Sequence, residues 1–148
     1  MREMLFRAKT ADENEWIYGD IFHSGAYPKI MRIHDYKNHV NYAVNPETLG
    51  QYTGLTDKNG MKIFEGDMIK YEETSGRSVL YGAINFGKYG TYPDNPPYMY
   101  NIGFYINWLN NPLLRQELGF WVGQRGIVII GNIHDNPELR QEDDNEGA

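Results

Sequence analysis

Three carboxylates placed beside glycines are the residues best suited to acid–base chemistry. Asp20 follows Gly19, and Glu65 and Asp67 flank Gly66. A general acid–base pair needs two such groups in one cleft, with the pKa of one raised by burial. The spacing also has a structural explanation, because aspartate accepts backbone hydrogen bonds inside tight turns and glycine supplies the unusual φ. We favour turns at Gly19-Asp20 and Gly66-Asp67 over a catalytic pair.

Two histidines and an aspartate, His34, Asp35 and His39, have the chemistry of metal ligands. Histidines five residues apart on a strand point to opposite faces, so only a loop could bring them together. The chain has no cysteine, which excludes thiolate zinc sites and disulfides. Neither a Gly-rich phosphate loop nor a nucleophile elbow is present. We therefore predict a polar loop at these histidines, no metal, no cofactor and no enzymatic activity.

The segment from Lys88 to Asn101 is the strongest candidate for binding. Exposed tyrosines on a rigid segment make good interface anchors, because they bury a large area at little entropic cost. Single-stranded bases could stack on the same rings, but only Lys88 would attract their phosphates. Alternatively, the segment is an ordered flap whose rings pack on the sheet. The tyrosines are Tyr89, Tyr92, Tyr98 and Tyr100, interspersed with Gly90, Pro93, Pro96 and Pro97.

The net charge of −6 is concentrated at the end of the chain. Residues 141–148 hold four acids and no base, so the rest has 14 basic against 16 acidic residues, a net of −2. We expect a disordered acidic tail on a nearly neutral body, which offers no basic groove for nucleic-acid phosphates. The N-terminus is charged where a signal peptide would be apolar, and the longest aliphatic run, Ile127–Ile130, is too short to span a bilayer. A soluble, cytoplasmic protein is expected.

Composition and periodicity predict a mainly β fold. Twelve tyrosines, sixteen glycines and seven prolines favour strands and tight turns. One strand alternates cleanly over 99–108 and should be half-buried, whereas 127–133 is apolar on both faces and should be buried from two sides. A turn is expected over Asp57–Gly60, with Gly60 at positive φ. The other expected strands are 16–23, 29–33, 40–44, 68–71 and 78–86.

Three Asn-Pro pairs predict short helical turns, because Asn can cap free backbone amides and Pro suits the first helical position. They are Asn45-Pro46, Asn111-Pro112 with a helix over 113–118 ending at Gly119, and Asn136-Pro137. The expected architecture is antiparallel: curled sheets or small barrels in a single domain over residues 1–140. A soft seam near 72–78 could divide it.

The glycines and acids of the central stretch Val44–Tyr71 form a signature, and the closing segment Ile127–Leu139 adds a second. Both resemble the YopX family of phage- and prophage-encoded proteins. Met1–Lys9 is similar to the opening of that family, and Glu15–Asp20 is similar to its first strand and corner. The resemblance implies a phage or prophage origin, a bacterial host cell and a β fold with SH3-like barrel character near 65–69. It implies no catalytic mechanism. The signature positions are Gly54, Asp57, Asn59, Gly60, Glu65, Gly66, Asp67, Gly131 and Asn132.

These observations favour a non-catalytic accessory protein that binds a host or phage protein. It could also self-associate, through a sheet edge or through the tyrosine-rich segment. The alternative is a small-barrel nucleic-acid-binding protein, which requires Lys58, Lys62, Lys70 and Arg77 to gather on one face. A hydrolase that uses the clustered carboxylates is a more distant alternative.

Overall fold

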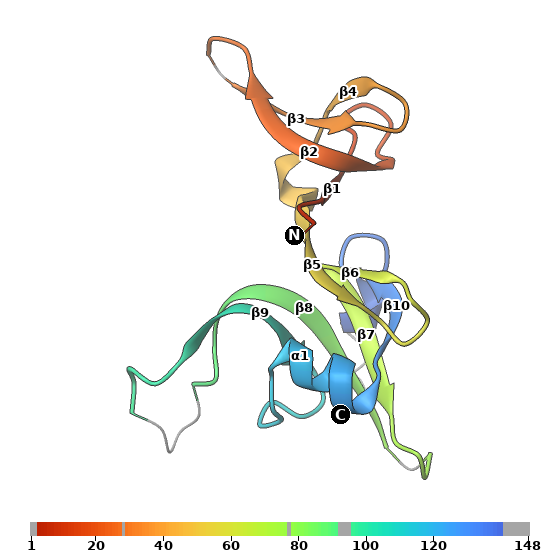
Figure 1. Ribbon diagram of the computed structural model, residues 1–148, viewed down its shortest axis with the longest axis vertical. Helices are drawn as coiled ribbons and strands as arrows, with labels where there is room; N and C mark the ends of the chain where they lie inside the picture. Colours follow the sequence, from red (N-terminus) through yellow and green to blue (C-terminus); the bar gives the residue numbers. More distant parts are fainter. Residues whose placement is uncertain (1–2, 28, 77, 92–95, 141–148) are drawn as a thin grey trace. The chain divides into compact units, whose positions relative to one another are not determined.

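The computed structural model describes residues 3–27, 29–76, 78–91 and 96–140. Antiparallel strands dominate it, as the sequence predicts, and Figure 1 shows few and short helices. The chain divides into two compact units, Met1–Gly54 and Leu55–Ala148. The division falls at Gly54, within a strand. The single domain over 1–140 and its seam near 72–78 stay predictions.

The first unit holds an antiparallel sheet with the strand order β4-β3-β2-β1-β5, and β5 pairs on its other side with β6 (Lys62–Phe64), the sixth strand of this sheet. A small core of Ala8, Ile33 and Val44 lies against it. Asn45 caps the short 3-10 helix η1 as expected, because its side chain accepts the backbone N–H of Glu47 at 3.1 Å. The elements are β1 (Phe6–Lys9), β2 (Trp16–Ser24), β3 (Ile30–Asp35), β4 (Val40–Ala43), η1 (Pro46–Thr48) and β5 (Gly50–Thr56), which continues into the second unit.

The turn predicted at Gly19-Asp20 is wrong, because both residues lie inside β2. Gly19 is needed there for a close approach of two strands. A Cβ on Gly19 would lie 1.8 Å from the carbonyl oxygen of His34. Glycine at this position therefore reflects strand packing and not an unusual φ.

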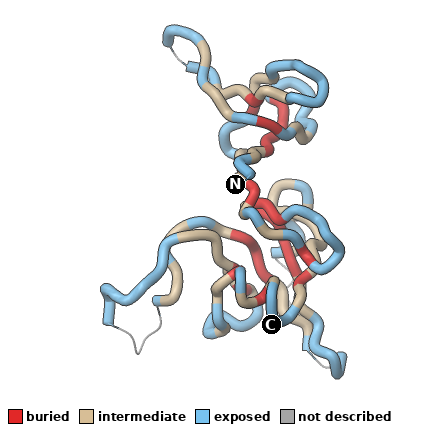
Figure 2. Tube along the Cα trace, in the orientation of Figure 1, coloured by how far each residue is buried: buried red, intermediate tan, exposed pale blue. Residues whose placement is uncertain are grey.

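The second unit holds a four-stranded antiparallel sheet in the order β10-β7-β8-β9. A helical segment packs on one end of it, and Figure 2 shows the buried residues concentrated there. The elements are β6 (Lys62–Phe64), β7 (Asp67–Glu72), β8 (Val79–Tyr89), β9 (Asn101–Trp108), α1 (Leu118–Phe120), the π-helix η2 (Trp121–Arg125) and β10 (Val128–Asn132). The core consists of Ile63, Ile69, Ile84, Ile106, Trp108, Leu118, Trp121 and Ile127.

The central signature is a set of turns held by buried carboxylates. Asp57 accepts the backbone N–H groups of Asn59 and Met61 at 2.9 Å, and its other oxygen accepts that of Ile129 at 3.1 Å. Gly60 has φ +82° and Gly66 has φ +93°, as the turn predictions require. These residues therefore fix the hairpin and tie it to β10, which is a structural role.

A carboxylate and two asparagines shape the other signature turns. Asp67 accepts the N–H of Phe64 at 2.7 Å beside the turn at Gly66. In the closing segment, Asn132 accepts the N–H groups of His134 and Asp135, and Asn136 accepts that of Asn132. These contacts also are turn contacts.

Two further element predictions are wrong. The helix expected over 113–118 is a single turn followed by an extended stretch, because Gln116 pairs with β9 through the N–H of Ile106 at 2.9 Å. The helix begins only at Leu118, so Gly119 lies inside it. Strand β10 is not buried from two sides, since it lies at the edge of its sheet and its residues are half-buried.

The third Asn-Pro pair does lead into one helical turn, over 138–140. In the described residues neither sheet closes into a barrel, so the fold is two open antiparallel sheets.

Candidate functional site

The hairpin of β8 and β9 is the element from which the candidate site is built. Its register pairs Ile84 with Ile106 and Phe86 with Phe104, so these four side chains share one face. The neighbouring strand β7 has 6 residues and pairs with β8 only as far as Ala83, whereas β8 has 11 residues. The hairpin therefore extends past the rest of the sheet, which Figure 1 shows.

The inner and outer parts of this face have different surroundings. Ile84 and Ile106 are fully buried under the helical segment. The outer hairpin, which we define as residues 86–91 and 96–104, exposes large apolar side chains. Of its described residues, Lys88 alone carries a charge. The exposed fractions are 55% for Phe86, 78% for Tyr98, 53% for Met99, 42% for Tyr100 and 69% for Ile102.

Three of the four predicted tyrosines lie in the outer hairpin, each in a different environment. The Tyr89 ring stacks on Tyr105 with centroids 5.4 Å apart. The ammonium of Lys88 lies 4.2 Å from the centre of the Tyr100 ring. Tyr98 is largely exposed, and Tyr92 lies outside the described residues. The interface role of the four tyrosines stays a prediction.

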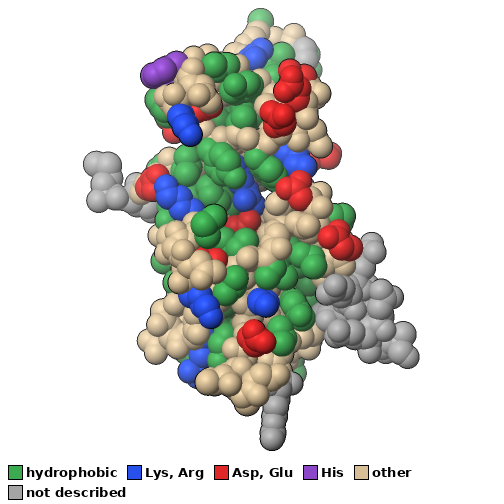
Figure 3. Space-filling model, turned by 90° about the vertical axis from the view of Figure 1, so that its right-hand side faces the viewer, with side chains coloured by type: hydrophobic (Ala, Val, Ile, Leu, Met, Phe, Trp, Pro, Cys, Tyr) green, Lys and Arg blue, Asp and Glu red, His purple; other side chains and the backbone are tan. Residues whose placement is uncertain are grey.

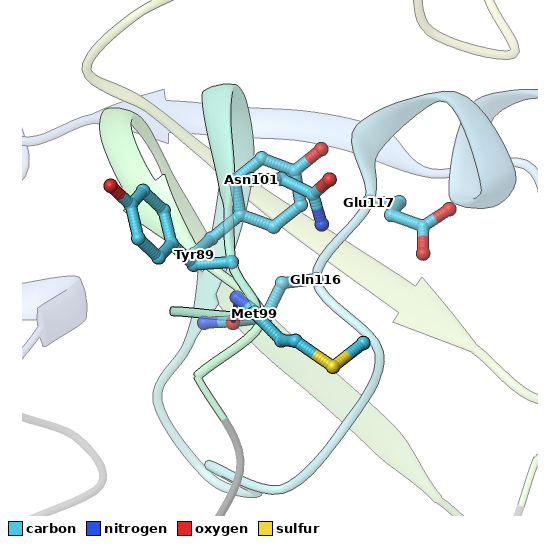
Figure 4. A pocket seen from close by; sticks show the side chains of 7 residues that line it. Tyr89, Met99, Asn101, Gln116 and Glu117 are labelled. Carbon is cyan, nitrogen blue, oxygen red and sulfur yellow. Dashed lines mark hydrogen bonds between the residues drawn. The ribbon is translucent and has the colours of Figure 1, made fainter. Parts of the chain in front are cut away.

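A pocket of about 240 Å³ opens where the outer hairpin meets the extended stretch before α1. The backbone N–H of Gly90 donates to Oε1 of Gln116 at 3.0 Å and joins the two segments. In Figure 4, Tyr89 and Glu117 lie on opposite sides of the view, with Asn101, Gln116 and Met99 between them. The lining residues are Tyr89, Gly90, Met99, Tyr100, Asn101, Gln116 and Glu117.

The basic residues proposed for nucleic-acid binding come from three elements. Lys58 lies in the turn between β5 and β6, Lys62 on β6 and Lys70 on β7, while Arg77 lies outside the described residues. Lys58 and Lys70 both border the start of β10. On the face drawn in Figure 3, basic side chains lie among acidic ones and form no separate field. Nucleic-acid binding therefore stays a prediction.

The carboxylates and histidines of the first unit form ordinary polar contacts. Oδ2 of Asp20 accepts a hydrogen bond from the hydroxyl of Tyr36 at 2.5 Å, and this bond, with the charge of Asp20, raises the pKa of Tyr36. The pKa of Asp35 is lowered, mainly by the side-chain hydrogen bond from Asn38. Nδ1 of His34 lies 2.5 Å from Oδ1 of Asn41. Among the described residues, no three His, Cys, Asp or Glu side chains gather as metal ligands would.

Reasoning from the sequence missed part of the exposed surface. Alternation places Phe86 on one face with Leu80 and Ile84, and Ile102 on the apolar face of a half-buried strand. Gln116 and Glu117 are assigned to a helix. The lengths of the expected strands carry one available signal. The strand over 99–108 is longer than the strand over 68–71, which should lie beside the hairpin formed by 78–86 and 99–108. Residues beyond the shorter strand have no neighbour to cover them.

The comparisons with known proteins identify the class to which this chain belongs. It is a member of the YopX family, whose model, described as YopX protein, matches residues 5–141. Among solved structures, the chain is similar to protein EF1440 from Enterococcus faecalis at 23% identity. That similarity covers 95% of this chain and 99% of that one, with a TM-score of 0.49. No curated protein matches the chain. In the part of the chain that the structure describes, no helix is both long and apolar enough to cross a membrane.

Proposed function

We propose that this chain is a non-catalytic protein-interaction module that binds its partner through the outer hairpin. A single observation carries this proposal: the hairpin continues past its sheet with an apolar surface that bears one charge in its described part. Depletion of charge together with enrichment of Tyr, Phe and Met is the composition of interface centres. The phage or prophage origin and the site of action inside a bacterial cell, both suggested by the family resemblance, belong to the same proposal.

The size of the exposed surface supports this function. A fully exposed aromatic side chain carries roughly 150–250 Å². The exposed fractions of Phe86, Tyr98 and Tyr100 therefore amount to on the order of 300 Å², the size of the largest apolar patch on a typical monomer, which is often functional. Met99 and Ile102 enlarge the patch. Self-association is the second form of the proposal, because the same surface can bury itself against another copy.

The proposal is tested by a quantitative pull-down from bacterial lysate with tagged protein. The variant Ile102→Asp places a charge in the outer hairpin, and Leu113→Asp is its matched control. Leu113 is 70% exposed against 69% for Ile102, but it lies outside the hairpin. We expect a specific protein to be retained by the wild type and by Leu113→Asp and to be lost with Ile102→Asp.

Two outcomes would overturn the proposal. Equal retention by both variants would show that the outer hairpin is not the contact surface. Retention of nuclease-sensitive material alone, with steep salt dependence, would replace protein binding with nucleic-acid binding. Sedimentation velocity on the same three proteins tests self-association, which should weaken only with Ile102→Asp.

A further inference from the structure

The pocket beside the outer hairpin has a lining in which several side chains are held in place. Oε1 of Gln116 accepts the N–H of Gly90, so the amide NH₂ of Gln116 is directed elsewhere. Tyr89 has one ring face against Tyr105, and Tyr100 has Lys88 over its ring. Because these side chains are already fixed, a ligand would lose little entropy in ordering them.

The lining carries a single carboxylate. Among the seven lining residues, Glu117 alone is formally charged. Its Oε2 accepts Nη2 of Arg115 at 3.0 Å in an exposed pair, and the guanidinium of Arg115 lies 4.2 Å from the centre of the Phe120 ring. A carboxylate has about four lone-pair sites, so Glu117 can accept a further donor while this bond is kept.

We propose that this pocket binds one arginine side chain of the partner protein. The inference rests on the proposed function, since it names the chemistry of the partner at that surface. A guanidinium is planar, stacks on aromatic rings and donates five N–H bonds, which suits the Tyr89 ring, the amide oxygen of Asn101 and the carboxylate of Glu117. A volume of about 240 Å³ suits a single side chain better than a drug-sized molecule.

Other side chains fit this lining less well. A lysine ammonium has no planar face to stack on the Tyr89 ring and is more strongly hydrated. A glutamate or aspartate would meet Glu117 at close range, where like charges repel. A phenylalanine would leave the amides of Asn101 and Gln116 without partners. Arginine is also among the residues that most often anchor protein interfaces.

The test is an NMR titration of the full-length ¹⁵N-labelled protein with N-acetyl-L-arginine amide. We expect saturable shifts of the Gly90 backbone signal and the Asn101 and Gln116 side-chain signals, at about millimolar affinity for so small a probe. N-acetyl-L-lysine amide should bind at least about threefold more weakly, and N-acetyl-L-glutamate amide should not bind. Glu117→Gln should weaken the arginine probe by about three- to fivefold.

The matched control is Glu73→Gln, which removes one exposed carboxylate outside the pocket and should leave the titration unchanged. The proposal is wrong if the arginine probe causes no saturable shift, if glutamate binds as well, or if Glu117→Gln has no effect. The pull-down separates the two proposals. If Ile102→Asp abolishes partner retention and Glu117→Gln does not, the interaction function stands and the arginine pocket falls.

Discussion

The inner and outer parts of the β8–β9 hairpin have the same alternating pattern but opposite surroundings. Ile84 and Ile106 are fully buried, whereas Ile102, on the same face and four residues from Ile106, is 69% exposed. The difference arises because the helical segment covers only the inner end of the hairpin, and because β7 pairs with β8 no further than Ala83. Alternation therefore defines a face of a strand, and the neighbouring elements define which part of that face is core.

The largest expected effect comes from removing an inner side chain. Ile106→Ala should lower the free energy of unfolding by about 2–5 kcal/mol, because it leaves a cavity in a fully buried cluster. Ile102→Ala, on the same face, should change it by less than about 0.5 kcal/mol. Urea denaturation of both variants measures the contrast. Equal losses would mean that the outer hairpin is covered in solution.

The next effect concerns the segment that covers the inner hairpin. The indole N–H groups of Trp108 and Trp121 both donate to the carbonyl oxygen of Arg115, at 2.9 and 2.6 Å. Trp121→Phe removes one of these bonds and some buried volume, so we expect a loss of about 1–3 kcal/mol. Hydrogen exchange should then quicken in 115–125 and stay unchanged in 86–89. Equally faster exchange in both segments would contradict the separation of the inner from the outer hairpin.

A smaller effect is expected from the cation on the outer hairpin. Lys88→Met removes the ammonium over the Tyr100 ring, a contact worth about 0.5–1 kcal/mol at an exposed site. In thermal unfolding, the melting temperature should fall by no more than a loss of this energy produces. Because the variant also removes the charge, it should bind hydrophobic-interaction resin more tightly, and Lys37→Met at another exposed site serves as its control.

The smallest effect on folding should come from a charge placed in the outer patch. Ile102→Asp should leave the free energy of unfolding within about 0.5 kcal/mol of the wild type, since the side chain is mostly exposed. The same substitution at Ile106 should prevent folding, because it buries an unpaired charge. Circular dichroism and urea denaturation distinguish the two variants. A strongly destabilised Ile102→Asp would remove the basis for an available surface.

Local chemistry made several elements predictable. The turn at Asp57–Gly60 and the corner at Gly66-Asp67 follow from short-range bonds and from glycine φ, and the cap at Asn45 follows in the same way. The helix expected after Pro112 failed because Gln116 pairs with β9 through Ile106, ten residues earlier, a contact that the capping residues do not indicate. The burial of β10 was overestimated because aliphatic composition does not distinguish an edge strand from a central one.

The candidate site also has a part that the sequence predicts and a part that it does not. The sequence by itself determined a mainly β chain, its turns and the tyrosine-rich segment, because strand periodicity and turn geometry act over a few residues. Only the tertiary structure decided that Phe86 and Ile102 are exposed and that Glu117 meets Tyr89 and Tyr100 in one pocket. Burial and convergence depend on which distant elements pack together, and that is a property of the whole fold.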